Sequence, residues 1–90
     1  MKIKELLGGE TKWAKGFEAY DGRGLSVPYD SLSAVKWCLV GAINKCYPSS
    51  EDQDMVVSQI QGFLEVCDLA EWNDGATFED VKSLTEELDI

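Results

Sequence analysis

The 90-residue sequence predicts a mostly helical α+β fold, with about four helices around a central apolar helix at residues 31–46 and one short β-hairpin at residues 12–27. Three observations predict it. The hydrophobic content is 44%, with only two prolines and eight glycines, which is typical of a chain that buries a core. Apolar residues recur at helical spacing through the second half, and a D-G dipeptide divides the first. The length fits one domain, residues 1–90.

The first 28 residues are expected to form a short helix and then the hairpin. Residues 2–7 place their apolar side chains on one helical face and are followed by two glycines, which end helices well. Aromatic residues then lead into the turn sequence Asp21-Gly22-Arg23-Gly24, and Leu25 and Val27 alternate on the expected return strand. Pro28 ends the hairpin because it pushes Val27 out of the helical region.

Residues 31–46 have the clearest helical periodicity, and Asp30 stands where a helix cap is expected. The periodic apolar positions are Leu32, Val35, Leu39, Ala42, Ile43 and Cys46. Since Trp37, Cys38 and Val40 add apolar surface to the other face, this helix is predicted to be buried in the middle of the fold.

Two further helices are expected in the second half. Ser50 to Gln53 form a capping box for a helix that runs to about residue 67. Its predicted buried stripe is Val56, Ile60, Phe63 and Cys67. Residues 68–75 are expected to be a connection rather than a helix. Thr77 and Asp80 cap the last helix, whose predicted core face is Phe78, Val81, Leu84 and Leu88.

The charged residues are distributed unevenly along the chain, and they restrict the kinds of partner that it can bind. Eight basic and seventeen acidic residues give a net charge of −9, which opposes direct binding to nucleic acid or an anionic membrane. Residues 1–24 and 25–50 each carry +1, whereas residues 51–90 hold twelve acids against Lys82 alone, a net −11. The absence of histidine removes the Ser-His and Cys-His nucleophile pairs.

The cysteines and the N-terminal segment indicate the compartment. Cys38, Cys46 and Cys67 are an odd number without C-x-x-C spacing, so they are expected to be reduced. Residues 1–10 lack a signal-peptide apolar region, and no stretch is long enough to span a membrane. We therefore expect a cytoplasmic protein. No cofactor or metal is predicted: the absence of histidine removes the common zinc ligand sets that contain it, and the calcium-like run from Asp52 has Val57 instead of glycine at position six.

The leading function hypothesis is a small acidic, non-enzymatic binding protein that docks residues 51–90 on a basic protein surface. A nucleic-acid-binding host protein would be such a partner, and the chain would then act as an inhibitor. Trp72 lies in a polar stretch and is expected to anchor the interface. The predicted partner-binding residues are Glu51, Asp52, Asp54, Glu71, Trp72, Asp74, Glu79, Asp80, Glu86 and Glu87.

Two alternatives come from other classes. Cys38 could serve a thiol-dependent enzyme or redox sensor, with Asn73 or Asp74 as orienting group, although a carboxylate, lysine or water would have to act as base. Packing inside an apolar helix is the stronger interpretation of this cysteine. Alternatively, a homo-oligomeric structural protein could bury Trp13 or Trp72 across a two-fold axis.

Several short motifs resemble a small family of uncharacterised bacterial and phage proteins. These are W-C-x-x-G-A at Trp37–Ala42, W-N-D at Trp72–Asp74, and a [TS]-x-x-[DE]-V helix start at Thr77. Lys12–Gly16 and Asp21–Gly24 are similar to the family's upstream W-x-x-G and D-G-R pieces. The family often has a proline after W-N-D, which Asp74–Thr77 lacks. The resemblance covers most of the chain and implies a shared fold and a setting in the cytoplasm of a bacterial or phage-infected host cell, but no catalytic residue.

Overall fold

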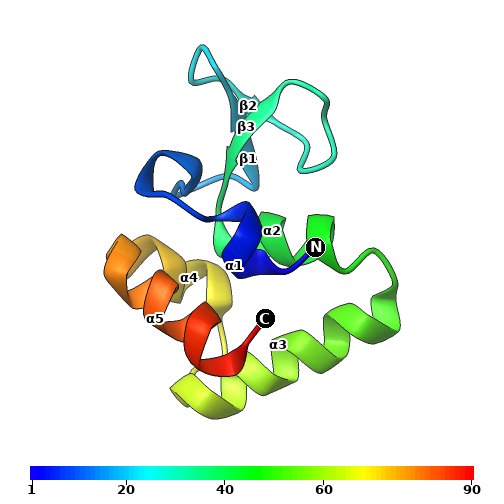
Figure 1. The fold of residues 1–90 in the computed structure, drawn as a ribbon, viewed down its shortest axis with the longest axis vertical. Helices are drawn as coiled ribbons and strands as arrows, with labels where there is room; N and C mark the ends of the chain where they lie inside the picture. The colour runs from blue at the N-terminus through cyan, green and yellow to red at the C-terminus, as the bar shows by residue number, and fades with distance from the viewer.

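The computed structural model describes all 90 residues, and its strands and most of its helices lie at opposite ends of the molecule (Figure 1). The elements in order are α1 (Ile3–Leu6), a 3-10 turn (Glu10–Lys12), β1 (Ala19–Asp21), β2 (Ser26–Val27), β3 (Ala34–Trp37), α2 (Leu39–Cys46), α3 (Ser50–Leu64), α4 (Leu69–Gly75) and α5 (Phe78–Leu88). This architecture confirms the mostly helical α+β class. We call residues 10–37 the sheet half and residues 50–90 the helical half; α1 and α2 lie between them.

The sheet has three antiparallel strands in the order β2-β1-β3. The predicted hairpin is present over residues 19–27, because the buried Asp21 carboxylate accepts hydrogen bonds from the backbone N–H groups of Arg23 and Leu25 and holds the turn closed. Gly24 adopts the left-handed conformation, with φ of 82°. The hairpin's predicted start at residue 12 is wrong, since residues 10–12 form the 3-10 turn and Trp13 pairs in parallel with Trp37.

The central helix is shorter than predicted, because residues 34–37 form a strand. β3 pairs with β1, aligning Trp37 with Ala19 and Lys36 with Tyr20. These pairings join segments far apart in the sequence, which helical spacing alone does not detect. Asp30 therefore caps no helix, and Leu32 is fully exposed instead of buried. The remaining helix, α2, is central as predicted, since it contacts α1, α3, α4 and β3.

α2 begins at Cys38, whose sulfur accepts a hydrogen bond from the backbone N–H of Gly41 at 3.4 Å. Gly41 faces the backbone of Glu18, just before β1. A Cβ at position 41 would lie 2.1 Å from the Glu18 carbonyl oxygen, far inside van der Waals contact. The close approach also lets Cys38 N–H donate to that same carbonyl. Glycine at position 41 thus sets the distance between α2 and the sheet.

The helical half contains one helix more than predicted. Residues 68–75 include α4, because the Asp68 side chain caps it by accepting from the Glu71 N–H at 3.1 Å. α3 is capped by Ser49 rather than Ser50, and it ends before residue 67. Glu65 there adopts the left-handed conformation. The capping box of α5 at Thr77 and Asp80 is confirmed by both of its hydrogen bonds.

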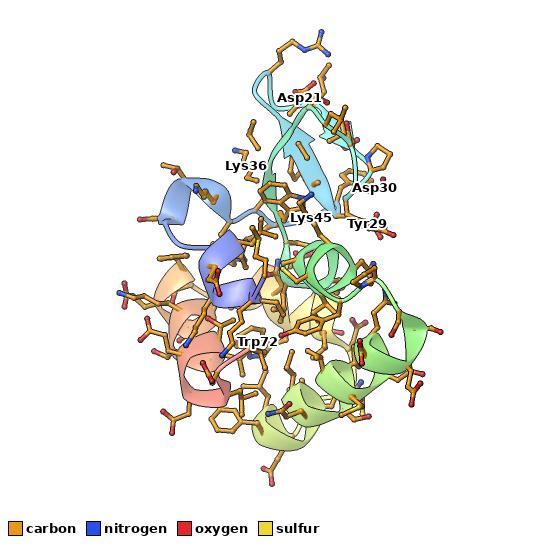
Figure 2. All side chains as sticks on the ribbon, turned by 45° about the vertical axis from the view of Figure 1, so that its right-hand side comes forward. Asp21, Tyr29, Asp30, Lys36, Lys45 and Trp72 are labelled. Atoms are coloured by element: carbon orange, nitrogen blue, oxygen red, sulfur yellow. The ribbon has the colours of Figure 1, made fainter.

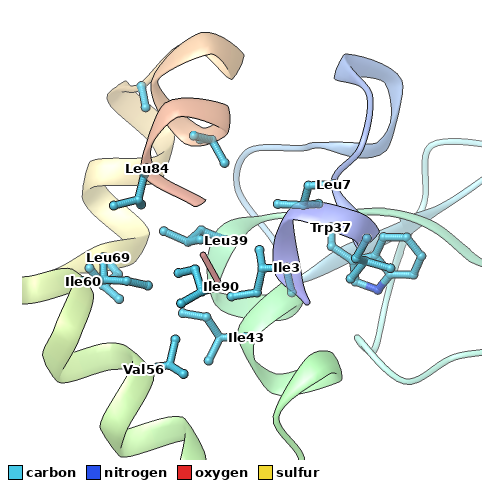
Figure 3. Packing of buried hydrophobic residues seen from close by; sticks show 14 of the residues in the cluster. Ile3, Leu7, Trp37, Leu39, Ile43, Val56, Ile60, Leu69, Leu84 and Ile90 are labelled. Carbon is cyan, nitrogen blue, oxygen red and sulfur yellow. The ribbon is translucent and has the colours of Figure 1, made fainter. Parts of the chain in front are cut away.

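The core is one cluster of fifteen buried residues, with Leu39 and Ile43 of α2 among side chains from α1, α3, α4 and α5 (Figure 3). Val56, Ile60, Val81 and Leu84 are buried as predicted. The expected burial of Val35, Phe63 and Cys67 is wrong, because each of the three is exposed. Phe63 leaves 51% of its surface in solvent at the end of α3.

We expect Gly41→Ala to lower the free energy of unfolding by about 2 to 3 kcal/mol, because the methyl group must push α2 away from the Glu18 backbone. Gly62→Ala in α3 is the matched control. Its Cβ would meet nothing within 4 Å, so the substitution should stabilise the protein by roughly 0.5 kcal/mol through helix propensity. Urea denaturation of both variants measures the difference, and equal effects would contradict the close approach.

Candidate partner-binding groove

The carboxylates of the helical half are exposed and largely unpaired. All twelve acidic side chains of residues 51–90 face solvent, around the outer surfaces of α3, α4 and α5 (Figure 2). Only Asp89 forms ion pairs, with Lys2 at 2.7 Å and with Lys4. Hydrogen bonds from these two lysines lower the pKa of Asp89 to about 2. The other eleven carboxylates form no ion pair within the chain.

The basic residues of the first half mostly have partners of their own. Arg23 donates to the buried carboxylate of Asp21. The ammonium groups of Lys15, Lys36 and Lys45 lie 5.6–6.0 Å from the ring centroids of Trp13, Tyr20 and Trp37. Apart from Asp89, the carboxylates of the helical half therefore have no ion-pair partner in the rest of the molecule.

A groove runs between the end of α3, α4 and α5, with Trp72 at its middle. It consists of two hollows of about 470 and 420 Å³ that share Trp72 and Asp80. Its apolar lining comes from seven side chains: Phe63, Leu64, Val66, Cys67, Trp72, Ala76 and Leu84. Trp72 is half-buried and packs against the core, so its indole belongs both to the core's edge and to the groove. Figure 2 shows Trp72 among these helices, far from Asp21 and Lys36 of the sheet half.

Four carboxylates line this groove, and no basic side chain does. Asp68 and Asp80 each use one oxygen to cap a helix, and these bonds to Glu71 N–H and Thr77 N–H hold their side chains in place. Glu71 and Glu87 make no hydrogen bond within the chain that would restrict them. The groove therefore combines an apolar floor with a negatively charged rim. Two of the four rim carboxylates are held in place by their hydrogen bonds.

The groove brings together four of the ten predicted partner-binding residues: Glu71, Trp72, Asp80 and Glu87. Glu51, Asp52 and Asp54 lie in the first turns of α3, about 18 Å along the helix axis from its groove end. Glu79 and Glu86 point about 100–120° away from Asp80 around α5.

Asp74 turns toward the sheet half, where it accepts from the Gly16 N–H at 2.9 Å. Asp68 and Phe63 also line the groove, although neither was among the predicted partner-binding residues. The spacing of three residues from Asp68 to Glu71 is typical of a helix N-cap, and this signal could have identified Asp68.

The W-N-D segment has a structural centre, the buried side chain of Asn73. Its oxygen accepts from the Trp13 indole N–H at 2.7 Å and from the Leu39 N–H at 3.1 Å, and its amide nitrogen donates to the Ala14 carbonyl. Asn73 is 0% exposed. These bonds fasten α4 to the start of α2 and to the segment after the 3-10 turn, and they give Trp13 and Asn73 of the two motifs a structural role.

Cys38 is placed where a thiolate is disfavoured. Its side chain is 4% exposed, and burial raises the pKa of the thiol despite the hydrogen bonds from the Gly41 and Val40 N–H groups. The hydrogen bonds of Asn73 go to Trp13, Leu39, Ala14 and Asp74, so the amide is not engaged with the sulfur. This environment is typical of a structural cysteine.

No group of three or more Cys, Asp and Glu side chains is arranged to hold a metal ion. None of the helices has both the length and the apolar character needed to cross a lipid bilayer.

Comparison with known proteins found no match to a family model, a curated protein or a solved structure. The resemblance based on the W-C-x-x-G-A and W-N-D motifs therefore stays a prediction. Within this chain, the motif residues Trp13, Gly41 and Asn73 serve packing and buried hydrogen bonds.

We expect Asn73→Leu to destabilise the protein by about 2 to 4 kcal/mol, because it leaves the Trp13 indole N–H, the Leu39 N–H and the Ala14 carbonyl without partners. Asn44→Leu on α2 is the control, since its single side-chain bond, to Glu18 at 3.5 Å, is exposed; its effect should stay below about 0.5 kcal/mol. Chemical unfolding of both variants tests this, and similar values would show that the buried amide is dispensable.

We expect Cys67 to react with iodoacetamide in the native protein at least about tenfold faster than Cys38, because Cys67 is exposed and Cys38 is buried with a raised pKa. Mass spectrometry of the labelled peptides gives the rates, and labelling in denaturant provides the control in which the difference should vanish. Fast native alkylation of Cys38 would instead support the thiol-dependent alternative.

Proposed function

We propose that this chain is a non-enzymatic binding protein whose helical half docks on a basic surface of a nucleic-acid-binding protein. The observation that carries the proposal is the groove around Trp72, which has an apolar floor, four rim carboxylates and no lining cation. Protein interfaces commonly combine an apolar anchor at the centre with complementary charge at the rim.

The surrounding charge supports a basic partner. Eleven carboxylates without ion pairs create a negative field around α3, α4 and α5, and such a field accelerates encounter with a positively charged surface. Surfaces that bind nucleic acid are positively charged for the phosphates they contact. A protein presenting ordered carboxylates would compete with nucleic acid for that surface, as an inhibitor encoded by a phage would.

The bound state would use two parts of the site differently. The groove would provide short-range contact at Trp72, whereas Glu51, Asp52, Asp54, Glu79 and Glu86 lie away from it and would act mainly through the long-range field. Long-range attraction is screened above about 0.1 M salt, but apolar contact is not. The proposal therefore predicts binding that weakens with salt without vanishing.

We expect the double variant Glu71→Lys/Glu87→Lys to weaken partner binding by about 2 kcal/mol, roughly 30-fold, because two rim charges are reversed. The partner is captured from host lysate at two salt concentrations, purified and titrated. Added duplex DNA should displace the chain from it.

The matched control is Glu79→Lys/Glu86→Lys, which changes the net charge equally at two positions of α5 that do not line the groove. It should weaken binding by no more than about fivefold. An affinity that does not change with salt concentration would contradict the proposal. A partner that binds duplex DNA and this chain at the same time would contradict it as well.

A further inference from the structure

The groove's shape and walls indicate what kind of segment it would bind. Its two hollows lie on either side of Trp72, one lined by residues 66–68 and α4, the other by the end of α3 and by α5. A ligand that occupies both hollows must cross the Trp72 indole between them. It would place one apolar side chain on each side of that ring, against Val66 and Ala76 in one hollow and against Phe63 and Leu84 in the other.

The walls favour a helical ligand over an extended one. Every lining residue belongs to α3, α4, α5 or the short connections between them, and none belongs to a strand. None of the lining residues belongs to the β-sheet, so the groove offers no strand edge with a regular row of N–H and C=O groups for an extended segment to pair with. An extended segment would leave its own backbone unpaired at the contact, whereas a helix satisfies it internally.

The rim charges have a helical spacing of their own. Asp80 and Glu87 are seven residues apart on α5, which places them about 10.5 Å apart and within about 20° of the same direction. A helix lying along α5 would match them with basic residues at positions i and i+7. Glu71 and Asp68 come from a different element, α4 and its N-cap, so the complementary ligand carries basic residues on both flanks of its apolar stripe.

We propose that the groove receives a basic amphipathic α-helix of the partner, with apolar side chains on both sides of Trp72 and lysine or arginine side chains on the carboxylates of Asp80, Glu87 and Glu71. The inference rests on the proposed function and deepens it, because it names the element of the basic partner that is bound. Charge complementarity selects this occupant, since the lining contains four carboxylates and no cation.

Three peptide probes of about 18 residues, five helical turns, test the inference. The first is amphipathic, with leucines on one face and lysines or arginines on both flanks. The second is identical except for a central proline, which breaks the helix at a cost of about 3 kcal/mol. The third is oligolysine of equal charge. Titrations are followed by NMR of the labelled protein, with the Trp72 indole N–H and the Ser83 and Phe63 amides as reporters of the groove.

The amphipathic peptide should bind at least about tenfold more tightly than the other two and shift the three groove reporters. Equal affinity of the proline peptide would overturn the helical ligand in favour of an extended one. If oligolysine bound equally tightly without shifting the groove reporters, the groove would be excluded as the binding site. Docking through the acidic surface would then still hold. If no probe binds at low salt, the proposed function fails as well.

Substitution at Ser83 separates the groove from the general charge without disturbing the core. Ser83 is exposed on α5 and lines the hollow that contains Phe63 and Glu87. Ser83→Lys should weaken the amphipathic peptide by about tenfold, because it fills the hollow and repels the basic flank. Ser58→Lys, an equal charge change at an exposed position of α3 outside the groove, should leave the affinity within about twofold. Equal effects of the two variants would overturn the inference.

Discussion

The buried amide of Asn73 is the interaction on which the arrangement of the two halves depends. Its oxygen is shared by the Trp13 indole and the Leu39 N–H, and its nitrogen reaches the Ala14 carbonyl, so one side chain joins α4, α2 and the segment that leads into the sheet. The orientation of the two adjacent side chains follows from this. Because Asn73 points inward, the Asp74 side chain is directed toward Gly16 and the Trp72 side chain toward the groove. One buried polar group therefore fixes both the fold's centre and the position of the proposed anchor.

The separation of charge follows from how the cations of the first half are used. Arg23 closes the β1–β2 turn with Asp21, Lys2 and Lys4 hold Asp89, and three further lysines cover aromatic rings. Four of these six cations contact groups of the first half, and the ion pairs to the helical half are limited to those of Lys2 and Lys4 with Asp89. Eleven of the twelve carboxylates of residues 51–90 consequently remain without an ion pair on the folded surface. The acidic residues that are concentrated in the second half of the sequence therefore lie around the helices at one end of the molecule.

Features encoded by neighbouring residues could be predicted, and features encoded by distant ones could not. The Asp21 turn and the Thr77–Asp80 capping box depend on residues within four positions of each other, and both are present. β3 depends on pairing with β1, and the placement of α4 depends on Asn73 reaching Trp13 sixty residues away, although α4 itself has a local cap at Asp68. The same limit applies to the site. Trp72 and the carboxylates could be named as a set, but which of them share a groove is decided by how α3, α4 and α5 pack.

The position of Cys67 gives the groove an intrinsic attachment point for a probe. It is the exposed member of the three cysteines and lines the hollow beside Val66 and Trp72. An environment-sensitive fluorophore coupled to its thiol would sit at the mouth of the groove, within reach of quenching by the indole. Occupancy of the groove could then be followed optically in the native sequence, without engineering a new labelling site.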